Sequence, residues 1–214
     1  INMKKLNLFL LVLFICNCPV VSGYAFFDRD IRLLTMQDGL ADNTITSIYK
    51  DRDGFMWFGT RDGLNRFDSK KFYTFKSYSS EKGSLMSSYI LDLAKSPTGQ
   101  IWVSTNLGLQ KYDYQTDSFT LIDFTKGINC YSLQFDQQGN LWMILNGYSL
   151  VKYNESQGMH LNYMYKGSDP ITSFYITPQD QIWATTANGN VVFLDDDKNE
   201  FIALYIYMIF KMIR

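Results

Sequence analysis

The sequence predicts an all-β protein, a β-propeller built from repeated four-stranded blades. Four tryptophans fall 45, 40 and 41 residues apart, at Trp57, Trp102, Trp142 and Trp183. Each lies in a copy of one phrase: DRDGFMWFGTRDGLNRFD, SPTGQIWVSTNLGLQKYD, DQQGNLWMILNGYSLVKYN and TPQDQIWATTANGNVVFLDD. In every copy a turn precedes an apolar run holding the tryptophan, and a second turn leads to an apolar, mostly aromatic residue and a polar close. A period of about 40 to 45 residues with several short strands per unit is typical of propeller blades.

Each repeat holds four predicted strands, which gives blades at residues 45–88, 89–129, 130–170 and 171–204. Run length and turn chemistry place the strands of the first blade at Ile45–Tyr49, Phe55–Thr60, Leu64–Phe67 and Phe72–Lys76. Those of the second blade are Tyr89–Ala94, Ile101–Thr105, Leu109–Tyr112 and Phe119–Asp123. The second strand is apolar on both sides, as expected for a strand sandwiched between two neighbouring sheets.

The tryptophans and the turn glycines are predicted to be structural. Each tryptophan lies mid-strand in an apolar run, which favours a wedge between blades over a sugar-stacking platform. The turn glycines of the first two blades are Gly54, Gly63, Gly99 and Gly108. The run from Asp51 to Gly54 is similar to the opening of a calcium loop, but the other ligands of such a loop are missing. A hairpin turn is therefore favoured there.

Residues 1–25 predict an export signal. Residues 3–5 form a short basic segment, residues 6–21 are apolar, and residues 23–25 form a small-residue cleavage site. The mature chain is expected to begin near Phe26. An uncleaved anchor is the weaker alternative, because the apolar run is short for a membrane span and is interrupted by an asparagine and a proline.

The lead-in at residues 26–44 carries a predicted latch. Ile31–Thr35 occupies the place of a fourth strand belonging to the last blade of a ring, yet the fourth blade has its own candidate at Phe201–Leu204. The latch thus indicates a ring that has further blades beyond the four in the sequence. The apolar residues 205–214 depart from the repeat and are too short to cross a bilayer, so we expect the interrupted end of a larger gene. A closed four-bladed propeller is the alternative.

Composition excludes several classes of function. The formal net charge is −1 with scattered Lys and Arg, which argues against a nucleic-acid partner. The sequence lacks a phosphate-binding loop, a dinucleotide fingerprint, metal-spaced Cys or His pairs and a serine nucleophile motif, so no cofactor, metal or catalytic residue is predicted. Cys130 aligns with isoleucines of the other repeats and is expected to be buried. The single histidine, His160, falls in a different strand.

Ligand-binding residues are predicted at one end of the blades. Because strands alternate in direction, the loops after the second and fourth strands share one face, and the turns after the first and third share the other. The first set varies from blade to blade and supplies Arg61, Asp62, Asn106, Asn146, Tyr148 and Asn188. Residues 78–88 and 126–129 lie on the same face. Variable polar and aromatic groups on a rigid scaffold suit a hydroxyl-rich ligand.

The lead-in and first blade resemble a known family. TMQDGLADNTI at residues 35–45, DGFMWFGT at 53–60 and DGLNRFD at 62–68 are similar to the two-component regulator propeller repeat. The second blade matches closely and the last two loosely, since Leu145 replaces a Thr, Asn154 a closing Asp and Asp180 a turn Gly. No WD dipeptide or kelch Gly-Gly doublet points to another propeller family.

The resemblance implies the extracytoplasmic sensor region of a hybrid two-component system, which detects glycan fragments. The implied parent is anchored in the inner membrane, carries a seven-bladed ring, a histidine kinase and a DNA-binding part, and can form a dimer; this sequence holds four blades and none of the other parts. Expected partners are therefore an oligosaccharide or other small ligand and the rest of the parent, with a periplasmic location. Two alternatives remain: an exported propeller that binds sugar or protein without signalling, and a propeller lyase or hydrolase.

Overall fold

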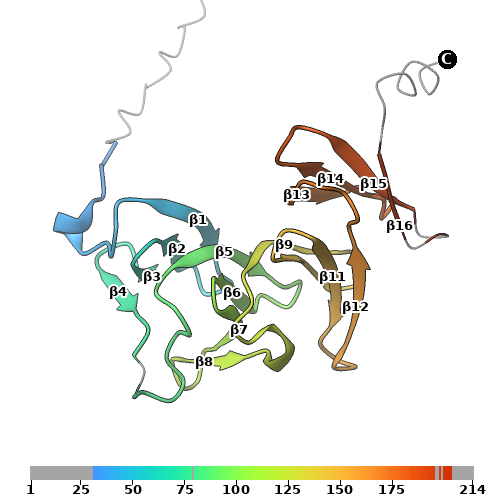
Figure 1. Ribbon diagram of the computed structural model, residues 1–214. Helices are drawn as coiled ribbons and strands as arrows, with labels where there is room; N and C mark the ends of the chain where they lie inside the picture. The colour runs from blue at the N-terminus through green and yellow to red at the C-terminus, as the bar shows by residue number, and fades with distance from the viewer. Residues whose placement is uncertain (1–30, 79, 196–197, 199, 204–214) are drawn as a thin grey trace, which may run out of the picture. The chain divides into compact units, whose positions relative to one another are not determined.

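A computed structural model describes residues 31–78, 80–195, 198 and 200–203. They form four antiparallel sheets, each with its strands in chain order (Figure 1). The first holds β1 (Ile45–Lys50), β2 (Met56–Thr60), β3 (Gly63–Phe67) and β4 (Phe72–Phe75). The second holds β5 (Ile90–Lys95), β6 (Ile101–Thr105), β7 (Gly108–Asp113) and β8 (Ser118–Leu121). The predicted strands of both blades are confirmed, with ends that differ by one or two residues.

The last two sheets repeat the pattern. The third holds β9 (Cys130–Phe135), β10 (Leu141–Leu145), β11 (Ser149–Asn154) and β12 (Met159–Met164). The fourth holds β13 (Ile171–Ile176), β14 (Ile182–Thr186), β15 (Val191–Asp195) and β16 (Glu200–Ala203). Two short 3₁₀ helices, η1 (Met36–Asp38) and η2 (Asp123–Thr125), lie in the connections. The fold is thus the predicted all-β propeller architecture. The predicted export signal and apolar tail lie outside the described residues.

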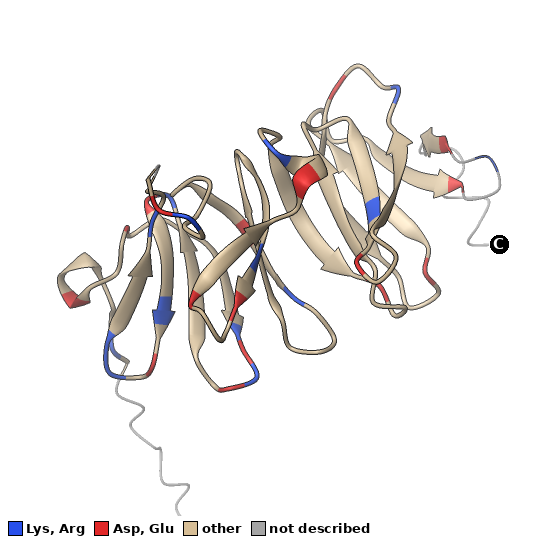
Figure 2. Ribbon diagram, turned by 90° about the horizontal axis from the view of Figure 1, so that it is seen from below, with Lys and Arg blue, Asp and Glu red and all other residues tan. Residues whose placement is uncertain are grey.

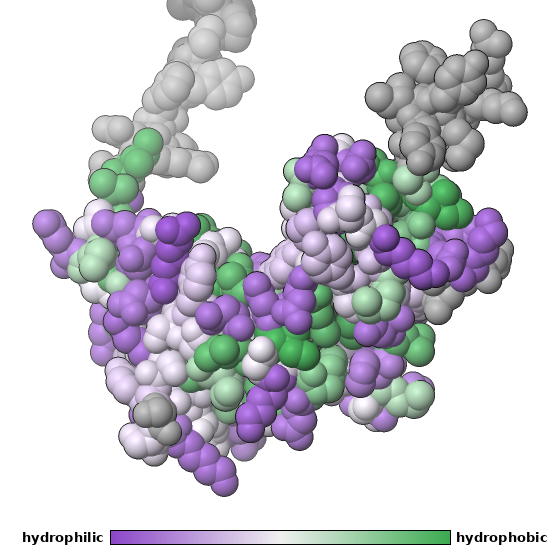
Figure 3. Space-filling view, in the orientation of Figure 1, coloured by the Kyte–Doolittle hydropathy of each residue, from purple (hydrophilic) through white to green (hydrophobic). Residues whose placement is uncertain are grey.

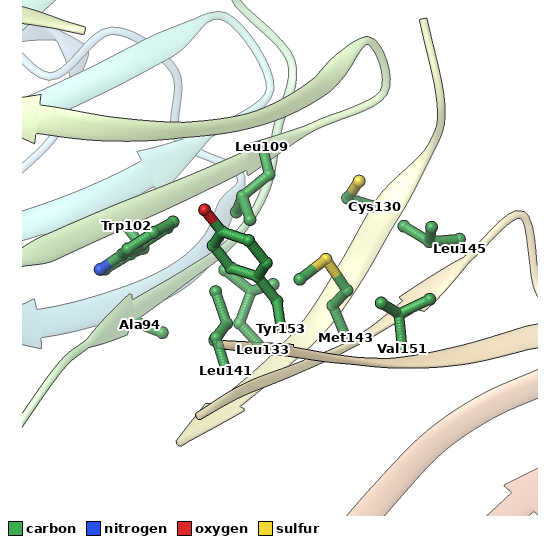
Figure 4. Close-up of a cluster of buried hydrophobic side chains, with 10 residues drawn as sticks. All are labelled: Ala94, Trp102, Leu109, Cys130, Leu133, Leu141, Met143, Leu145, Val151 and Tyr153. Carbon is green, nitrogen blue, oxygen red and sulfur yellow. The ribbon is translucent and has the colours of Figure 1, made fainter. Parts of the chain in front are cut away.

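Each sheet packs face to face on the next, and a tryptophan lies at the centre of each interface. Trp57 and Trp102 are fully buried and Trp142 nearly so. The cluster between the second and third sheets joins Trp102 and Leu109 to Leu133, Leu141 and Tyr153 (Figure 4). The wedge role predicted for these tryptophans is confirmed at three interfaces. Burial of such large apolar side chains is the main favourable contribution to packing the blades.

The second strand of each inner sheet is covered on both faces by a neighbouring sheet. Every residue of β6 and of β10 is buried, as the two-sided apolar pattern predicts. β2 and β14, in the first and fourth sheets, alternate between buried and partly exposed residues. Trp183 in β14 is half-buried, and its ring contact is with Phe193 of its own sheet. Within the described residues, the outer faces of these two sheets have no sheet packed against them.

Ile31–Thr35 forms no strand in the described part of the chain, and the latch predicted there, which needs a later blade as its partner, stays a prediction. Ile31 is 97% exposed and Leu33 80% exposed. Thr35 instead caps η1, through a capping box with Asp38. The physical reason is that a strand needs a hydrogen-bonding partner, and each sheet among the described residues already has its own fourth strand.

Two of the tryptophans donate hydrogen bonds to buried carboxylates in the turns that precede them. Asp51 accepts hydrogen bonds from the backbone N–H groups of Asp53 and Phe55, at 3.0 and 2.9 Å, and from Trp57 Nε1 at 2.8 Å. Asp136 accepts from Trp142 Nε1 at 2.9 Å. The hairpin turn predicted at Asp51–Gly54 is confirmed, because the carboxylate is saturated by protein donors. Ser96 replaces the acid in the second sheet, and Trp102 Nε1 has no hydrogen-bond partner in the described part of the chain.

The hydrogen bonds to the Asp136 carboxylate predict that the stability of the fold decreases in acid. Burial by itself raises the pKa of Asp136, but hydrogen bonds from Asn140 and Trp142 outweigh it and lower the pKa below the ordinary value. A lowered folded-state pKa contributes stability that is present above about pH 4 and is lost as pH falls through the folded value. Thermal melts from pH 7 to pH 3 should therefore show a smaller acid-dependent loss for Asp136→Asn than for wild type. Equal pH dependence in both proteins would contradict this role.

The uncovered outer faces predict self-association. Ile48 in β1, Tyr175 in β13 and Val191 in β15 are 54%, 57% and 39% exposed, and apolar side chains remain at the surface of the fourth sheet (Figure 3). Continuous apolar patches larger than a few hundred Å² are rare on monomers. Residues 26–214 expressed alone should associate or aggregate in sedimentation experiments and show no cooperative melt as a monomer. A sharp two-state melt from a sedimenting monomer would instead support a self-sufficient fold.

Candidate ligand-binding face

All six predicted ligand residues lie in the turns between the second and third strands of their sheets. These turns are at residues 61–62, 106–107, 146–148 and 187–190, and antiparallel pairing places them at the same end of each sheet. The side chains of Arg61, Asp62, Asn106, Asn146, Tyr148 and Asn188 are all exposed. The structure therefore leaves these groups accessible on one end of the blades, and their role in binding stays a prediction.

A threonine at the end of the second strand shapes the first two of these turns. Thr60 Oγ1 donates to the carbonyl of Gly63 at 2.7 Å and accepts from the N–H of Asp62 at 3.2 Å. Thr105 makes the same pair of bonds in the second sheet. Gly63 has φ of +142° and a Cβ there would lie 3.0 Å from the Phe75 carbonyl oxygen, so the turn requires glycine. The third sheet lacks this threonine, and Asn146 adopts φ of +49°.

The connections between sheets bond successive turns to one another. In the 122–129 connection, Gly127 donates to the carbonyl of Leu107 at 2.9 Å, and Asn129 exchanges two hydrogen bonds with Asn146. The 165–170 connection bonds to the third-sheet turn through the Tyr165 N–H, which donates to the carbonyl of Tyr148 at 2.8 Å. It bonds to the fourth-sheet turn through the Asp169 carboxylate, which accepts from the Asn188 N–H. The last three turns thus form one hydrogen-bonded surface that holds Asn106, Asn146, Tyr148 and Asn188.

Arg61 and Asp62 lie in a charged region beside the first sheet. Lys76 Nζ forms an ion pair with Asp62 Oδ2 at 2.6 Å. Hydrogen bonds from Thr44 lower the pKa of Asp42, and the positive charge of Arg61 adds to this effect. Acidic and basic residues are mixed over all four sheets (Figure 2). This part of the face can offer both donors and acceptors to a polar ligand.

The longest connection, between β4 and β5, covers two hollows of about 460 and 270 Å³. The larger lies between residues 77–86 of the connection and Gln110, Phe119 and Leu121 of the second sheet. The smaller is lined by the same connection, here including Lys76, and by Asp117 of the second sheet. Neither hollow is lined by any of the six predicted ligand residues. Of residues 78–88, also placed on this face by the sequence, Tyr78 and residues 81–86 line them.

Gln110 anchors this connection, although the sequence analysis did not single it out. Its side chain is 1% exposed, accepts from the N–H of Met86 at 2.7 Å and donates to the carbonyl of Ser84 at 3.1 Å. Asn65, at the same position of the first sheet, likewise accepts from the N–H of Ala41 at 2.9 Å. The available signal was an amide inside an otherwise apolar third strand, because a buried amide must find hydrogen-bond partners.

The groups most suited to catalysis are not arranged for it. Cys130 is fully buried, as predicted, and burial raises the pKa of its thiol to about 12. His160 is exposed on β12, where its ring stacks on Phe124 with centroids 4.1 Å apart. In the described ranges no group of three or more His, Cys, Asp or Glu side chains could hold a metal ion. In the same ranges, no helix has the length and apolar character needed to span a membrane.

The first repeat of the chain matches a known family. The family model described as two component regulator propeller matches residues 39–62, which cover the end of the lead-in, β1, β2 and the turn after it. Residues 39–62 carry the two component regulator propeller repeat. The first-blade resemblance seen in the sequence is therefore confirmed. A histidine kinase of Formosa agariphila is 49% identical to this repeat region over 41 residues, which are 19% of the chain and 3% of that protein.

Solved structures share the propeller fold. One is an extracellular domain assigned to a hybrid two component system of B. thetaiotaomicron, with 22% identity and a TM-score of 0.72 over 82% of this chain and 26% of the other. Another is a catalytically inactive virginiamycin B lyase from Staphylococcus aureus bound to quinupristin, with 14% identity and a TM-score of 0.59 over 81% and 58% of the two chains. This chain spans about a quarter of the length of the first of these structures.

The anchor at Gln110 predicts a specific loosening of the β4–β5 connection. Gln110→Leu removes both hydrogen bonds and leaves the Met86 N–H and the Ser84 carbonyl unpaired, which costs about 1–3 kcal/mol for each buried group left unsatisfied. Limited trypsin digestion should cut after Lys82 several times faster than in wild type. The matched control is Gln115→Leu in an exposed turn of the same sheet. Equal cleavage rates in the Gln110 and Gln115 variants would remove Gln110 from this role.

Proposed function

We propose that the chain is the ligand-sensing part of a hybrid two-component sensor and that its ligand is an oligosaccharide. The observation that carries this proposal is the regulator propeller repeat at residues 39–62, together with the fold shared with an extracellular domain of such a system. In this proposal the chain is exported to the periplasm, and the remaining blades, a membrane anchor and a kinase belong to a longer parent that works as a dimer.

The exposed turn residues support an oligosaccharide as the ligand class. Arg61 and the side-chain amides of Asn106, Asn146 and Asn188 offer hydrogen-bond donors and acceptors, and Tyr148, 40% exposed, adds an aromatic surface. The hydrogen bonds between turns and connections hold most of these groups on a fixed framework. Exposed polar groups on a rigid scaffold suit a ligand recognised by many hydroxyl contacts.

The two alternatives differ in what they require. An exported propeller that binds without signalling would show the same binding but no kinase in the same gene, so sequencing the DNA downstream separates it from the sensor. A lyase would need a catalytic cluster on this face. The virginiamycin B lyase shares the fold, but the buried Cys130 and the stacked His160 supply no such cluster among the described residues.

The proposal predicts oligosaccharide binding that depends on the turn residues. Calorimetry with a panel of plant and host glycan fragments should detect binding by the full chain. The double variant Arg61→Ala, Asn106→Ala should weaken it by about tenfold or more, because it removes hydrogen bonds that include one to a charged group.

The control removes two exposed side chains from the opposite end of the sheets, Lys70→Ala with Gln115→Ala, and should bind as wild type does. If the turn variant and the control bind equally well, the binding site lies elsewhere.

A further inference from the structure

The three interfaces between sheets differ at one position of the third strand. In the second sheet this position is Tyr112, whose ring packs on Trp57 at 4.8 Å between centroids and whose hydroxyl accepts from Arg66 Nη1 at 2.6 Å. In the third sheet it is Tyr153, which packs on Trp102 at 6.1 Å. In the fourth sheet the position belongs to Leu194, which lies in the cluster around Trp142. Leucine is shorter than tyrosine and has no hydroxyl group.

A hollow of about 350 Å³ lies at this third interface. Its apolar wall includes Trp142, Ile176 and Ile182, and its polar wall includes Asp136, Lys152 and Asp180. In the first interface the Tyr112 hydroxyl and the Arg66 guanidinium meet Asp117 in the corresponding space. Leu194 does not itself line the hollow. A tyrosine at its position would extend toward Lys152, as Tyr112 does toward Arg66, because Lys152 and Arg66 both pair with the tryptophan of their own sheet. A hollow of this size falls within the range of small-molecule sites, which is about 300–1,000 Å³.

Lys152 supplies hydrogen-bond donors to the hollow. Its ammonium lies 5.2 Å from the Trp142 ring centroid and 3.5 Å from Asp136 Oδ2. The Asp136 carboxylate already accepts from Trp142 Nε1, from the Asn140 side chain and from two backbone N–H groups. The ammonium has three N–H donors, and its one ion pair among the described residues is this long one. Lys152 can therefore bind an anionic group in the hollow.

Asp180 supplies an acceptor. Its Oδ2 accepts from Gln138 Nε2 at 2.9 Å, but its Oδ1 is buried and has no hydrogen-bond partner among the residues that the structure describes. The backbone is unusual as well, because Asp180 has φ of +60° where the other three sheets have a glycine: Gly54, Gly99 and Gly139. Both features cost stability, since glycine would remove the backbone strain and no buried oxygen would be left unpaired. Oδ2 has lone-pair capacity beyond its bond from Gln138 and can accept from a cationic ligand group.

We propose that this hollow binds a small zwitterion, such as a free α-amino acid with an apolar side chain. The ligand carboxylate would pair with Lys152, its ammonium with Asp180, and its side chain would contact the wall that holds Trp142 and Ile176. Opposite charges in one small hollow favour a ligand that carries both charges, because each then forms a charge-assisted hydrogen bond. The site is separate from the turn face proposed for oligosaccharides, so either can fail without the other.

The test uses calorimetry on the full chain with the common α-amino acids as probes. If L-phenylalanine is among those that bind, 3-phenylpropionate and 2-phenylethylamine are its comparators, since each keeps the ring and one charge. For any other amino acid that binds, the comparators are its own two analogues, one without the ammonium group and one without the carboxylate. Each analogue should bind at least about tenfold more weakly than the amino acid. Equal binding of an analogue, or no binding of any amino acid, would overturn the proposal.

Two variants test the location. Leu194→Tyr restores the residue found in the second and third sheets and extends a hydroxyl toward Lys152, and Asp180→Gly restores the turn glycine. Each should reduce amino-acid binding by about tenfold or more, and Asp180→Gly should leave the melting temperature equal or higher. The control Lys126→Met changes an exposed lysine outside the hollow and should bind as wild type does. Wild-type affinity in both Leu194→Tyr and Asp180→Gly would place any site elsewhere.

Discussion

The packing of a tryptophan between adjacent sheets is the interaction on which the rest of this structure depends. A four-stranded blade has two apolar faces and cannot cover them itself, so it is stable only when neighbours cover both. Trp57, Trp102 and Trp142 each fill the space against the next sheet, and the strands that carry the covered tryptophans of the inner sheets are buried throughout. Trp183 has the same place in its sheet but stays half-buried. Coverage by a neighbour, rather than strand sequence, therefore sets the burial of each tryptophan.

This packing leaves the two ends of the sheets free to differ. At one end, the turns after the first strands are closed by Asp51 and Asp136, which also fix the tryptophans. At the other end, the turns are bonded to the long connections, and buried amides such as Gln110 hold those connections down. The first end is therefore mainly structural. The second combines a fixed backbone with exposed polar side chains, which is the combination that recognition requires.

The interfaces also show how one repeat can acquire different properties. Arg66 and Tyr112 fill the first interface with a hydrogen-bonded cluster, and Lys111 of the second sheet pairs across the second interface with Glu155 of the third. The third interface has Leu194 at the tyrosine position and holds a hollow lined by the charged side chains of Asp136, Lys152 and Asp180. The tryptophan maintains the spacing of the sheets in each case. Side chains around it can then vary without loss of the architecture, because the apolar centre of the interface is retained.

The sequence by itself determined the repeat, the sixteen-strand pattern, the turns and the tryptophan wedges, because these depend on spacings within one repeat of the chain. It also located the exposed turn residues, since strand direction alone assigns them to one end. Only the tertiary structure decided which connections bond to which turns, that Ile31–Thr35 forms no strand, and that a hollow lies beside Trp142. These features depend on contacts between residues about one repeat apart, such as Gln138 with Asp180. Such contacts follow from how neighbouring sheets face each other, which local periodicity does not encode.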